Sequence, residues 1–120
     1  MDKKIVITGL GVIAPNGIGK AEFWRALKDG RSGVKSITRF DTNEFKTKLA
    51  GEVSDFKPED FLGAKVTKDL NRTTRFLCSV AKFALEDAHL TINDDNTDQF
   101  GVCTGTTLSS LWNIAEFDGW

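Results

Sequence analysis

The heptapeptide Lys3-Lys4-Ile5-Val6-Ile7-Thr8-Gly9 decides how we expect the chain to fold. Its β-branched residues follow one another without polar alternation, which is typical of a strand buried on both faces of a sheet. A buried first strand of this kind favours an α/β fold. The glycine-rich stretch 9–19 then predicts a tight loop, and the apolar spacing after it predicts a helix from Lys20 to Lys28, which Gly30 is placed to terminate.

Further segments continue this alternation along the chain. Leu49–Val53 and Phe100–Thr104 predict a second and a third strand, because β-branched and apolar residues lie between turn signals. Lys57–Phe61 predicts a helical turn, and the apolar periodicity of Arg72–His89 predicts the longest helix. A last helix is expected to begin near Leu108. This order predicts the α/β class, with a mainly parallel or mixed sheet covered by helices.

Composition narrows the possible classes of protein. The 120 residues carry 16 Lys and Arg against 17 Asp and Glu, a balance that argues against a polybasic nucleic-acid binder. No run approaches the roughly 20 apolar residues of a membrane span, and the start lacks the apolar stretch and cleavage site of a signal peptide. We therefore expect a cytoplasmic protein with no membrane attachment, long enough for one modest domain.

The stretch Gly9–Ala14 fits the G-x-G-x-x-(G/A) pattern by which backbone amides approach a pyrophosphate group. The helix that this motif requires would have to run through Pro15 and Gly17, and both residues disfavour a helix interior. A structural strand-to-loop turn is therefore the favoured interpretation. A nucleotide-binding module is kept as the last alternative.

Few residues are candidates for catalysis or metal binding. Cys78 lies within the predicted long helix and Cys103 within a predicted buried strand, so both are expected to be inert core thiols. His89 follows two acidic residues at a helix end, where the helix dipole favours a solvated cation. The chain has no other histidine and no pair of closely spaced cysteines, so no transition-metal site is expected.

A basic stretch precedes and enters the predicted long helix. It contains Lys65, Lys68, Arg72 and Arg75 and is interrupted by Asp69. The simplest interpretation is a solvated helix face. The alternative is a docking surface for an acidic partner, since basic patches of this kind raise association rates and set orientation.

Four ordered segments together resemble the start of the type II β-ketoacyl-acyl carrier protein synthases. The segments are Ile5–Gly11, Ile37–Asp41, Leu49–Val53 and Ala84–Ala88. The resemblance reaches from the first predicted strand to about Phe117, but it corresponds only to the opening portion of a much longer family enzyme. We therefore expect residues 1–120 to be an incomplete N-terminal portion of a synthase domain.

The resemblance implies a thiolase-type fold and the decarboxylative condensation of acyl and malonyl thioesters in fatty-acid or related polyketide biosynthesis. The family uses a cysteine nucleophile and two histidines, and it needs no cofactor. Those catalytic motifs lie downstream of the matched region, and Cys78, Cys103 and His89 do not correspond to them. The resemblance thus places no catalytic residue in this chain, which we expect to be inactive by itself.

Two non-catalytic features carry over from the resemblance. Lys65 and Lys68 match basic positions that contact the acidic acyl carrier protein, and Arg72 is a further candidate contact, although Asp69 stands where the family has a base. Leu108 matches a position that lines the acyl pocket. The complete protein is expected to be a homodimer.

A non-enzymatic alternative follows from the same resemblance. Residues Thr107–Ser110 are bulkier and more polar than the glycine-rich family turn, and they would narrow the acyl pocket. This departure motivates a second hypothesis, a non-catalytic partner of the chain-length-factor type that pairs with an active ketosynthase.

Overall fold

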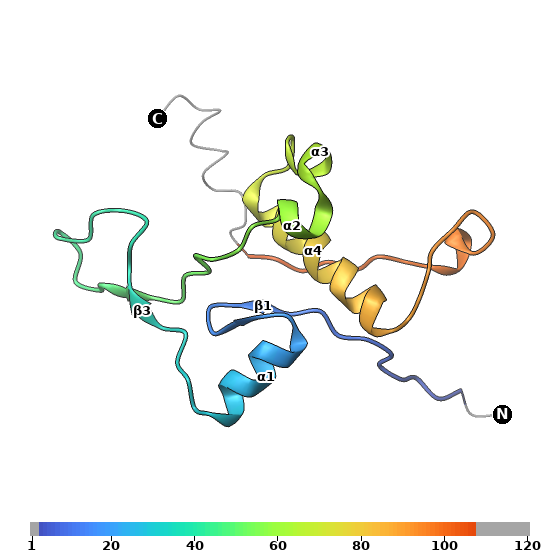
Figure 1. The fold of residues 1–120 in the computed structure, drawn as a ribbon, viewed down its shortest axis with the longest axis horizontal. Coiled ribbons are helices and arrows are strands. Elements are labelled where there is room, and N and C mark those ends of the chain that lie inside the picture. Colours follow the sequence, from blue (N-terminus) through green and yellow to red (C-terminus); the bar gives the residue numbers. More distant parts are fainter. Residues whose placement is uncertain (1–2, 108–120) are drawn as a thin grey trace.

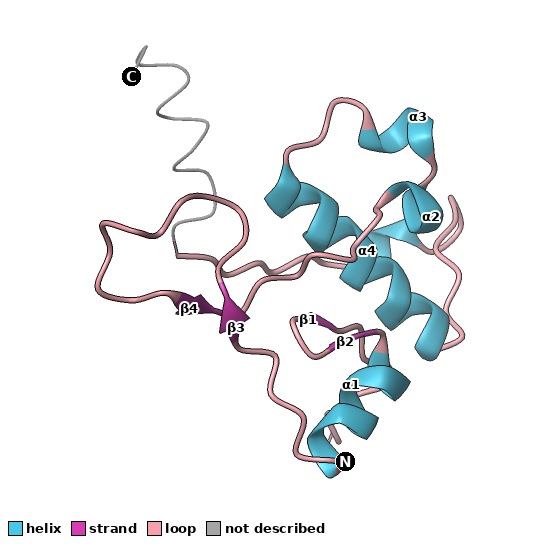
Figure 2. Cartoon of the chain, turned by 60° about the vertical axis from the view of Figure 1, so that its left-hand side comes forward, coloured by secondary structure: helices cyan, strands magenta, loops and turns pink. Residues whose placement is uncertain are grey.

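Helix α4 (Arg72–Asp87) runs through the middle of the molecule and organises the elements around it (Figure 1). The computed structural model describes residues 3–107. Helices α2 and α3 lie at one end of α4, and α1 lies on the opposite side of the molecule from α3 (Figures 1 and 2). The other elements, in chain order, are β1 (Ile13–Ala14), β2 (Gly17–Ile18), α1 (Lys20–Lys28), β3 (Lys35–Ser36), β4 (Leu49–Ala50), α2 (Glu59–Leu62), α3 (Ala64–Thr67) and the 3₁₀ helix η1 (Thr97–Gln99).

Local sequence explains both ends of α4. The side chain of Asn71 accepts a hydrogen bond from the amide of Thr74 at 2.8 Å, which satisfies one of the unpaired donors at the helix N-terminus. At the other end His89 adopts a φ of 53°, and its amide and that of Leu90 donate to the carbonyls of Glu86 and Leu85. These two bonds form a Schellman motif with histidine in the left-handed position. The predicted helix 72–89 is thus confirmed, two residues shorter.

The predicted helix from Lys20 to Lys28 is confirmed as α1. Gly30 terminates it with a φ of 64°, because a left-handed residue turns the chain away and glycine adopts that conformation without a Cβ clash. The amide of Arg31 then donates to the carbonyl of Ala26 at 2.9 Å. Ala26 is fully buried.

Four phenylalanines join α2 to α4. The rings of Phe56 and Phe76 stack with centroids 4.7 Å apart, and Phe61 meets Phe83 edge-on at 4.9 Å. Phe56 also stacks on Phe61 at 5.9 Å. These separations lie in the range that aromatic pairs prefer, so the cluster fixes the predicted turn, observed as α2 at Glu59–Leu62, against the long helix.

The strands differ from those expected. Two short antiparallel hairpins are present, one pairing Ile13 with Ile18 and the other pairing Lys35 with Ala50. Only Leu49–Ala50 of the predicted second strand is a strand. Within residues 3–107 there is no parallel pairing, so the expected parallel or mixed sheet is wrong for this part of the chain.

The other two predicted strands, 3–8 and 100–104, are not part of any sheet in the described chain. Both stretches are exposed, so their predicted burial is wrong for this part of the chain. Ile5 is 99% exposed and Val102 is 91% exposed. A β-branched run favours extended backbone, but a strand also needs a neighbour about 4.8 Å away to pair its amides and carbonyls. No described segment supplies that neighbour to either stretch. The helix expected from Leu108 lies outside the described residues.

The buried core is correspondingly small. Ala26 and Phe56 are the buried apolar residues of the described chain, and the radius of gyration is 17.6 Å. A closely packed domain of this length would have a radius of gyration of about 14 Å. The elements are therefore spread out, with much apolar surface exposed.

Candidate functional site

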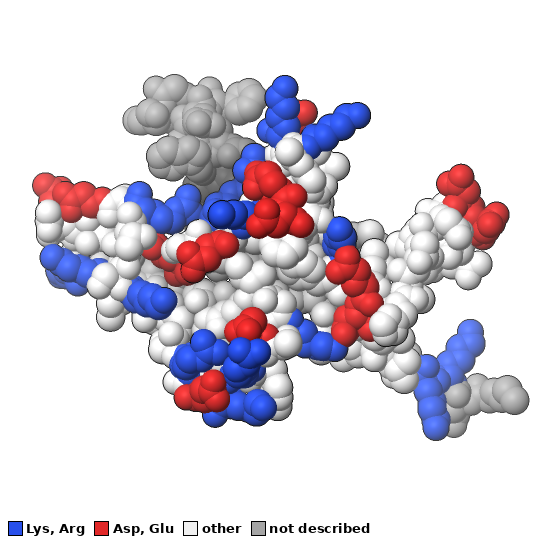
Figure 3. All heavy atoms as spheres, viewed as in Figure 1, with Lys and Arg blue, Asp and Glu red and all other residues white. Residues whose placement is uncertain are grey.

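The first two predicted docking residues, Lys65 and Lys68, lie on α3 and at its C-terminal end. Thr67 anchors this turn. Its hydroxyl donates to the carbonyls of Gly63 and Ala64, at 3.2 Å in each case, and the residue is buried. Both lysines are exposed, and neither side chain makes a hydrogen bond or ion pair with another described residue. Figure 3 shows basic side chains projecting where α3 lies, with an acidic one among them.

Arg72, the third predicted docking residue, is held differently. Its guanidinium donates to the carbonyl of Val53 at 2.6 Å and lies over the ring of Phe76, with 4.7 Å from Cζ to the ring centroid. Partial burial lowers the pKa of Arg72, and the nearby charges of Arg39 and Arg75 lower it further. Arg72 therefore ties the β3–β4 segment to α4, whereas the two lysines have no such internal role.

Within the β3–β4 segment, residues 35–53, the carboxylate of Glu52 forms a clamp with Thr38 and Arg39. Glu52 accepts hydrogen bonds from the amide of Thr38 at 3.0 Å, from its hydroxyl at 2.8 Å and from the amide of Arg39 at 3.3 Å. These bonds, led by the one from the hydroxyl, lower the pKa of Glu52. Together with Arg72, this clamp fixes the segment next to the N-terminus of α4.

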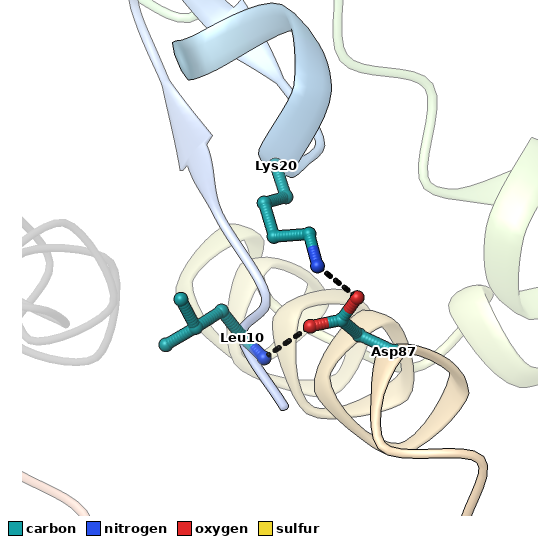
Figure 4. Close-up of polar contacts among 3 residues, drawn as sticks. All are labelled: Leu10, Lys20 and Asp87. Atoms are coloured by element: carbon teal, nitrogen blue, oxygen red, sulfur yellow. Dashed lines mark hydrogen bonds and ion pairs between the residues drawn. The ribbon is translucent and has the colours of Figure 1, made fainter. Parts of the chain in front are cut away.

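A second carboxylate joins three separate elements. Figure 4 shows Asp87, at the end of α4, between the side chain of Lys20 and the backbone amide of Leu10. Its Oδ2 accepts the Leu10 amide at 2.9 Å, and its Oδ1 pairs with the Lys20 ammonium. The hydrogen bond from Lys20 is the main reason that the pKa of Asp87 is lowered, and the Leu10 amide lowers it further.

The two glycines of the G-x-G motif approach α4. A Cβ on Gly11 would overlap the carbonyl of Val80, and one on Gly9 would overlap the carbonyl of Ala84. The motif is followed by the β1–β2 hairpin and not by the helix that pyrophosphate binding requires. This geometry favours the structural interpretation of the motif over the nucleotide-binding one.

Sequence reasoning did not find a hollow on the described surface. It has a volume of about 570 Å³ and is lined by the β1–β2 turn around Asn16, by Glu22 and Arg31, and by the Thr38–Glu52 clamp. The Pro15–Gly17 turn was its only sequence signal. Charges of both signs line it, so its chemistry does not single out a ligand.

The two thiols and the histidine lie on different segments of the described chain. Cys103 is exposed on the extended stretch 100–104, so its expected burial is wrong, and Cys78 is half-buried on α4. His89 is exposed at the helix end, as expected. Within residues 3–107 no group of three or more metal-ligating side chains could hold a metal ion, and no helix is long and apolar enough to cross a membrane. Leu108, the predicted acyl-pocket residue, lies outside the described part.

Comparison with known proteins identifies relatives over nearly the whole chain. It is 39% identical over 109 residues to 3-oxoacyl-[acyl-carrier-protein] synthase 2 of Synechocystis sp., covering 91% of this chain and 26% of the relative. The enzyme of the same name from Coxiella burnetii is 39% identical over 117 residues, covering 97% and 28%. The actinorhodin polyketide putative beta-ketoacyl synthase 2 of Streptomyces coelicolor is 40% identical over 107 residues, covering 89% and 26%. The chain thus spans about a quarter of the length of these relatives.

The structure supports the same relationship. It matches a chain of the solved structure titled "The ishigamide ketosynthase/chain length factor" with a TM-score of 0.76 and 35% identity, covering 95% of this chain and 28% of that one. The family model for the beta-ketoacyl synthase N-terminal domain matches residues 2–118. The family expected from the sequence is therefore confirmed: the chain belongs to the β-ketoacyl synthase family, within its N-terminal domain.

Proposed function

We propose that this chain is the N-terminal part of a 3-oxoacyl-acyl carrier protein synthase that condenses acyl and malonyl thioesters with loss of carbon dioxide. The observation that carries the proposal is the 39% identity to two synthases of that name over 91% and 97% of the chain. The product would belong to fatty-acid or related polyketide biosynthesis. No cofactor is needed in the proposed reaction.

The 120 residues alone would not catalyse this condensation. A condensing enzyme needs an activated nucleophile and donors that stabilise the thioester oxyanion. Cys103 is exposed on the extended stretch 100–104, and Cys78 is a half-buried thiol within α4. His89 adopts the left-handed conformation that ends α4. The part of the chain that the structure describes therefore contributes framework and docking surface to the reaction.

The docking surface is proposed to consist of Lys65, Lys68 and Arg72, with an acidic acyl carrier protein as its partner. Because both lysines are exposed and bind no other described side chain, they can contact a carrier protein without first breaking an internal bond. This suits a transient electrostatic encounter. Arg72 adds charge beside them while it remains bonded to Val53. Asp69 weakens the patch. Leu108 is proposed to line the acyl pocket, and the complete protein is proposed to be a homodimer.

Condensation assays test the proposal in two steps. The longer protein that contains this chain should release carbon dioxide from malonyl carrier protein when an acyl donor is present, and the purified 120-residue chain should not. Absence of condensation by the longer protein would contradict the enzymatic proposal. Reproducible condensation by the 120-residue chain would contradict the proposal that this chain is inactive by itself.

A second candidate function is a non-catalytic partner of the chain-length-factor type. The match to a solved structure whose title names both a ketosynthase and a chain length factor favours keeping it, as do the bulky residues Thr107–Ser110. The coding sequence downstream separates the two: a cysteine-centred motif followed by two histidine motifs supports the enzyme, and their loss supports the partner.

A further inference from the structure

Leu70 lies in the linker between α3 and α4, two residues after Lys68 and next to Asn71, the N-cap of α4. Both of its backbone polar groups are bonded. Its amide donates to the carbonyl of Thr67, the last residue of α3, at 3.2 Å. Its carbonyl accepts a hydrogen bond from Nε of Arg75, on α4, at 2.7 Å. Leu70 is therefore held from α3 on one side and from α4 on the other.

The side chain of Arg75 reaches back from the start of α4 to this linker. The residue is half-buried, and its own backbone amide donates to the carbonyl of Asn71 at 2.9 Å, so it is fixed in the helix. A hydrogen bond from a charged donor is stronger than one between neutral groups. Figure 2 shows the linker as the loop that carries the chain from α3 to the start of α4. The bond from Arg75 to Leu70 thus fixes how α3 is oriented relative to α4.

Helix α2 has separate anchors on α4. The phenylalanine cluster joins the two helices, and Nζ of Lys82 donates to the carbonyl of Phe61 in α2 at 2.6 Å. Loss of the Arg75 bond would therefore leave α2 in place. It would loosen the turn that carries Lys65 and Lys68.

We propose that Arg75 is a positioning residue for the docking of acyl carrier protein, because its bond to Leu70 holds α3 in the orientation that presents Lys65 and Lys68 together. This inference rests on the proposed docking function of those two lysines. An electrostatic encounter depends on where the charges lie when the partner arrives. A loosened turn would present them in several arrangements, so the binding-competent one would be populated less often. Arg75 acts through Leu70 and not by contact with the carrier protein.

Charge is the other route by which Arg75 could affect docking. Its charge is one of those that lower the pKa of Arg72, so it lies close to the docking residues. Two substitutions separate the bond from the charge. Arg75→Met removes both, whereas Arg75→Gln removes the charge and keeps an N–H donor as many bonds from the backbone as Nε. Lys82→Met is the matched control, since it also removes one charge and one bond from α4 to a backbone carbonyl.

Stopped-flow association with acyl carrier protein at low ionic strength tests the proposal in the longer protein that contains this chain. Arg75→Met should slow association by roughly twofold to tenfold, and Arg75→Gln and Lys82→Met should associate like the wild type. In a Lys65→Glu, Lys68→Glu background, Arg75→Met should cause no further slowing, because no docking charges remain for it to position. Equal slowing by Arg75→Met in both backgrounds, or equal slowing by Arg75→Met and Arg75→Gln, would overturn the proposal.

Hydrogen exchange of the same longer protein, measured by mass spectrometry, checks the structural step. The segment 67–71 should exchange about threefold to tenfold faster in Arg75→Met, as expected for the loss of one hydrogen bond, and at the wild-type rate in Arg75→Gln. Unchanged exchange in Arg75→Met would also overturn the proposal.

The lysine double variant by itself separates this inference from the proposed docking. If reversal of both lysine charges leaves association unchanged, docking on α3 is wrong and the role of Arg75 falls with it. If that reversal slows association and Arg75→Met does not, only the role of Arg75 is wrong.

Discussion

Lys20, the first residue of α1, forms an ion pair with Asp87, the last residue of α4, although 67 positions separate them in the sequence. Asp87 also accepts the amide of Leu10. One carboxylate, about one-quarter exposed, thus connects the N-terminal segment, the start of the first helix and the end of the longest one. Because the buried core is so small, we expect this junction to contribute to the stability of the fold.

We expect Asp87→Asn to lower the thermal unfolding midpoint at neutral pH. The asparagine oxygen can still accept the Leu10 amide, but the charge that pairs with Lys20 is lost. Since the folded-state pKa of Asp87 lies below its usual value, the stabilisation is present above that usual value and disappears as the pH falls through the folded-state pKa. The difference in midpoint between variant and wild type should therefore shrink in acid.

Asp94→Asn provides the control for this comparison. Asp94 is an exposed carboxylate in the loop between α4 and η1 and is not part of the junction. Its variant should unfold like the wild type at both pH values. An Asp87→Asn midpoint equal to that of the wild type at neutral pH would show that the junction does not stabilise the fold.

Gly11→Ala should destabilise the chain by about 1–3 kcal/mol, the usual cost of forcing a methyl group into filled space. The added Cβ would overlap the Val80 carbonyl and push the N-terminal segment away from α4. Gly101→Ala is the counterpart, because no atom lies within 4 Å of the Cβ that it would add. Urea unfolding of both variants measures the difference, and equal midpoints would disprove close packing at Gly11.

His89→Gly should stabilise the chain by about 1 kcal/mol, since a side chain in the left-handed region carries a steric penalty that glycine avoids. The φ of 53° at His89 is the only positive φ of a non-glycine residue in the described range. The same urea titration measures the gain. A loss of stability would mean that the favourable interaction of the imidazole with the end of α4 outweighs its backbone penalty.

Elements defined by local signals could be predicted from the sequence. Helix α4 has a broad apolar face and an Asn71 cap, and Gly30 ends α1. Neither feature depends on distant residues, so the apolar periodicity of α4 and the terminating Gly30 were sufficient to predict the two helices, whereas the Asn71 cap was not foreseen. The extended stretches 3–8 and 100–104 were also recognisable as β-prone, but their predicted burial is wrong for the described chain, because burial and pairing depend on segments that the described chain does not supply.

In the candidate site, too, the sequence predicted local features but not contacts between distant residues. Lys65 and Lys68 were expected to lie on a solvated face, and both are exposed. In this short turn it is Thr67 that points inward and is buried. The inward bond from Arg72 to Val53 was not foreseen. It joins residues 19 positions apart whose proximity depends on how the β3–β4 segment packs. The Asp87 junction was missed for the same reason.

Lys65→Glu combined with Lys68→Glu should slow association with acyl carrier protein in the longer protein that contains this chain. Reversing two exposed charges removes attraction and adds repulsion toward an acidic partner, so we expect the rate to fall roughly tenfold or more at low ionic strength. The effect should diminish at high salt, where screening shortens the reach of surface charges. Lys46→Glu with Lys48→Glu is the control: both lysines are also exposed, they lie in the loop before β4, and their replacement changes the net charge by the same amount. Stopped-flow binding distinguishes the two cases: equal slowing by both double variants would indicate a net-charge effect, and unchanged kinetics for the Lys65 and Lys68 variant would reject α3 as the docking surface.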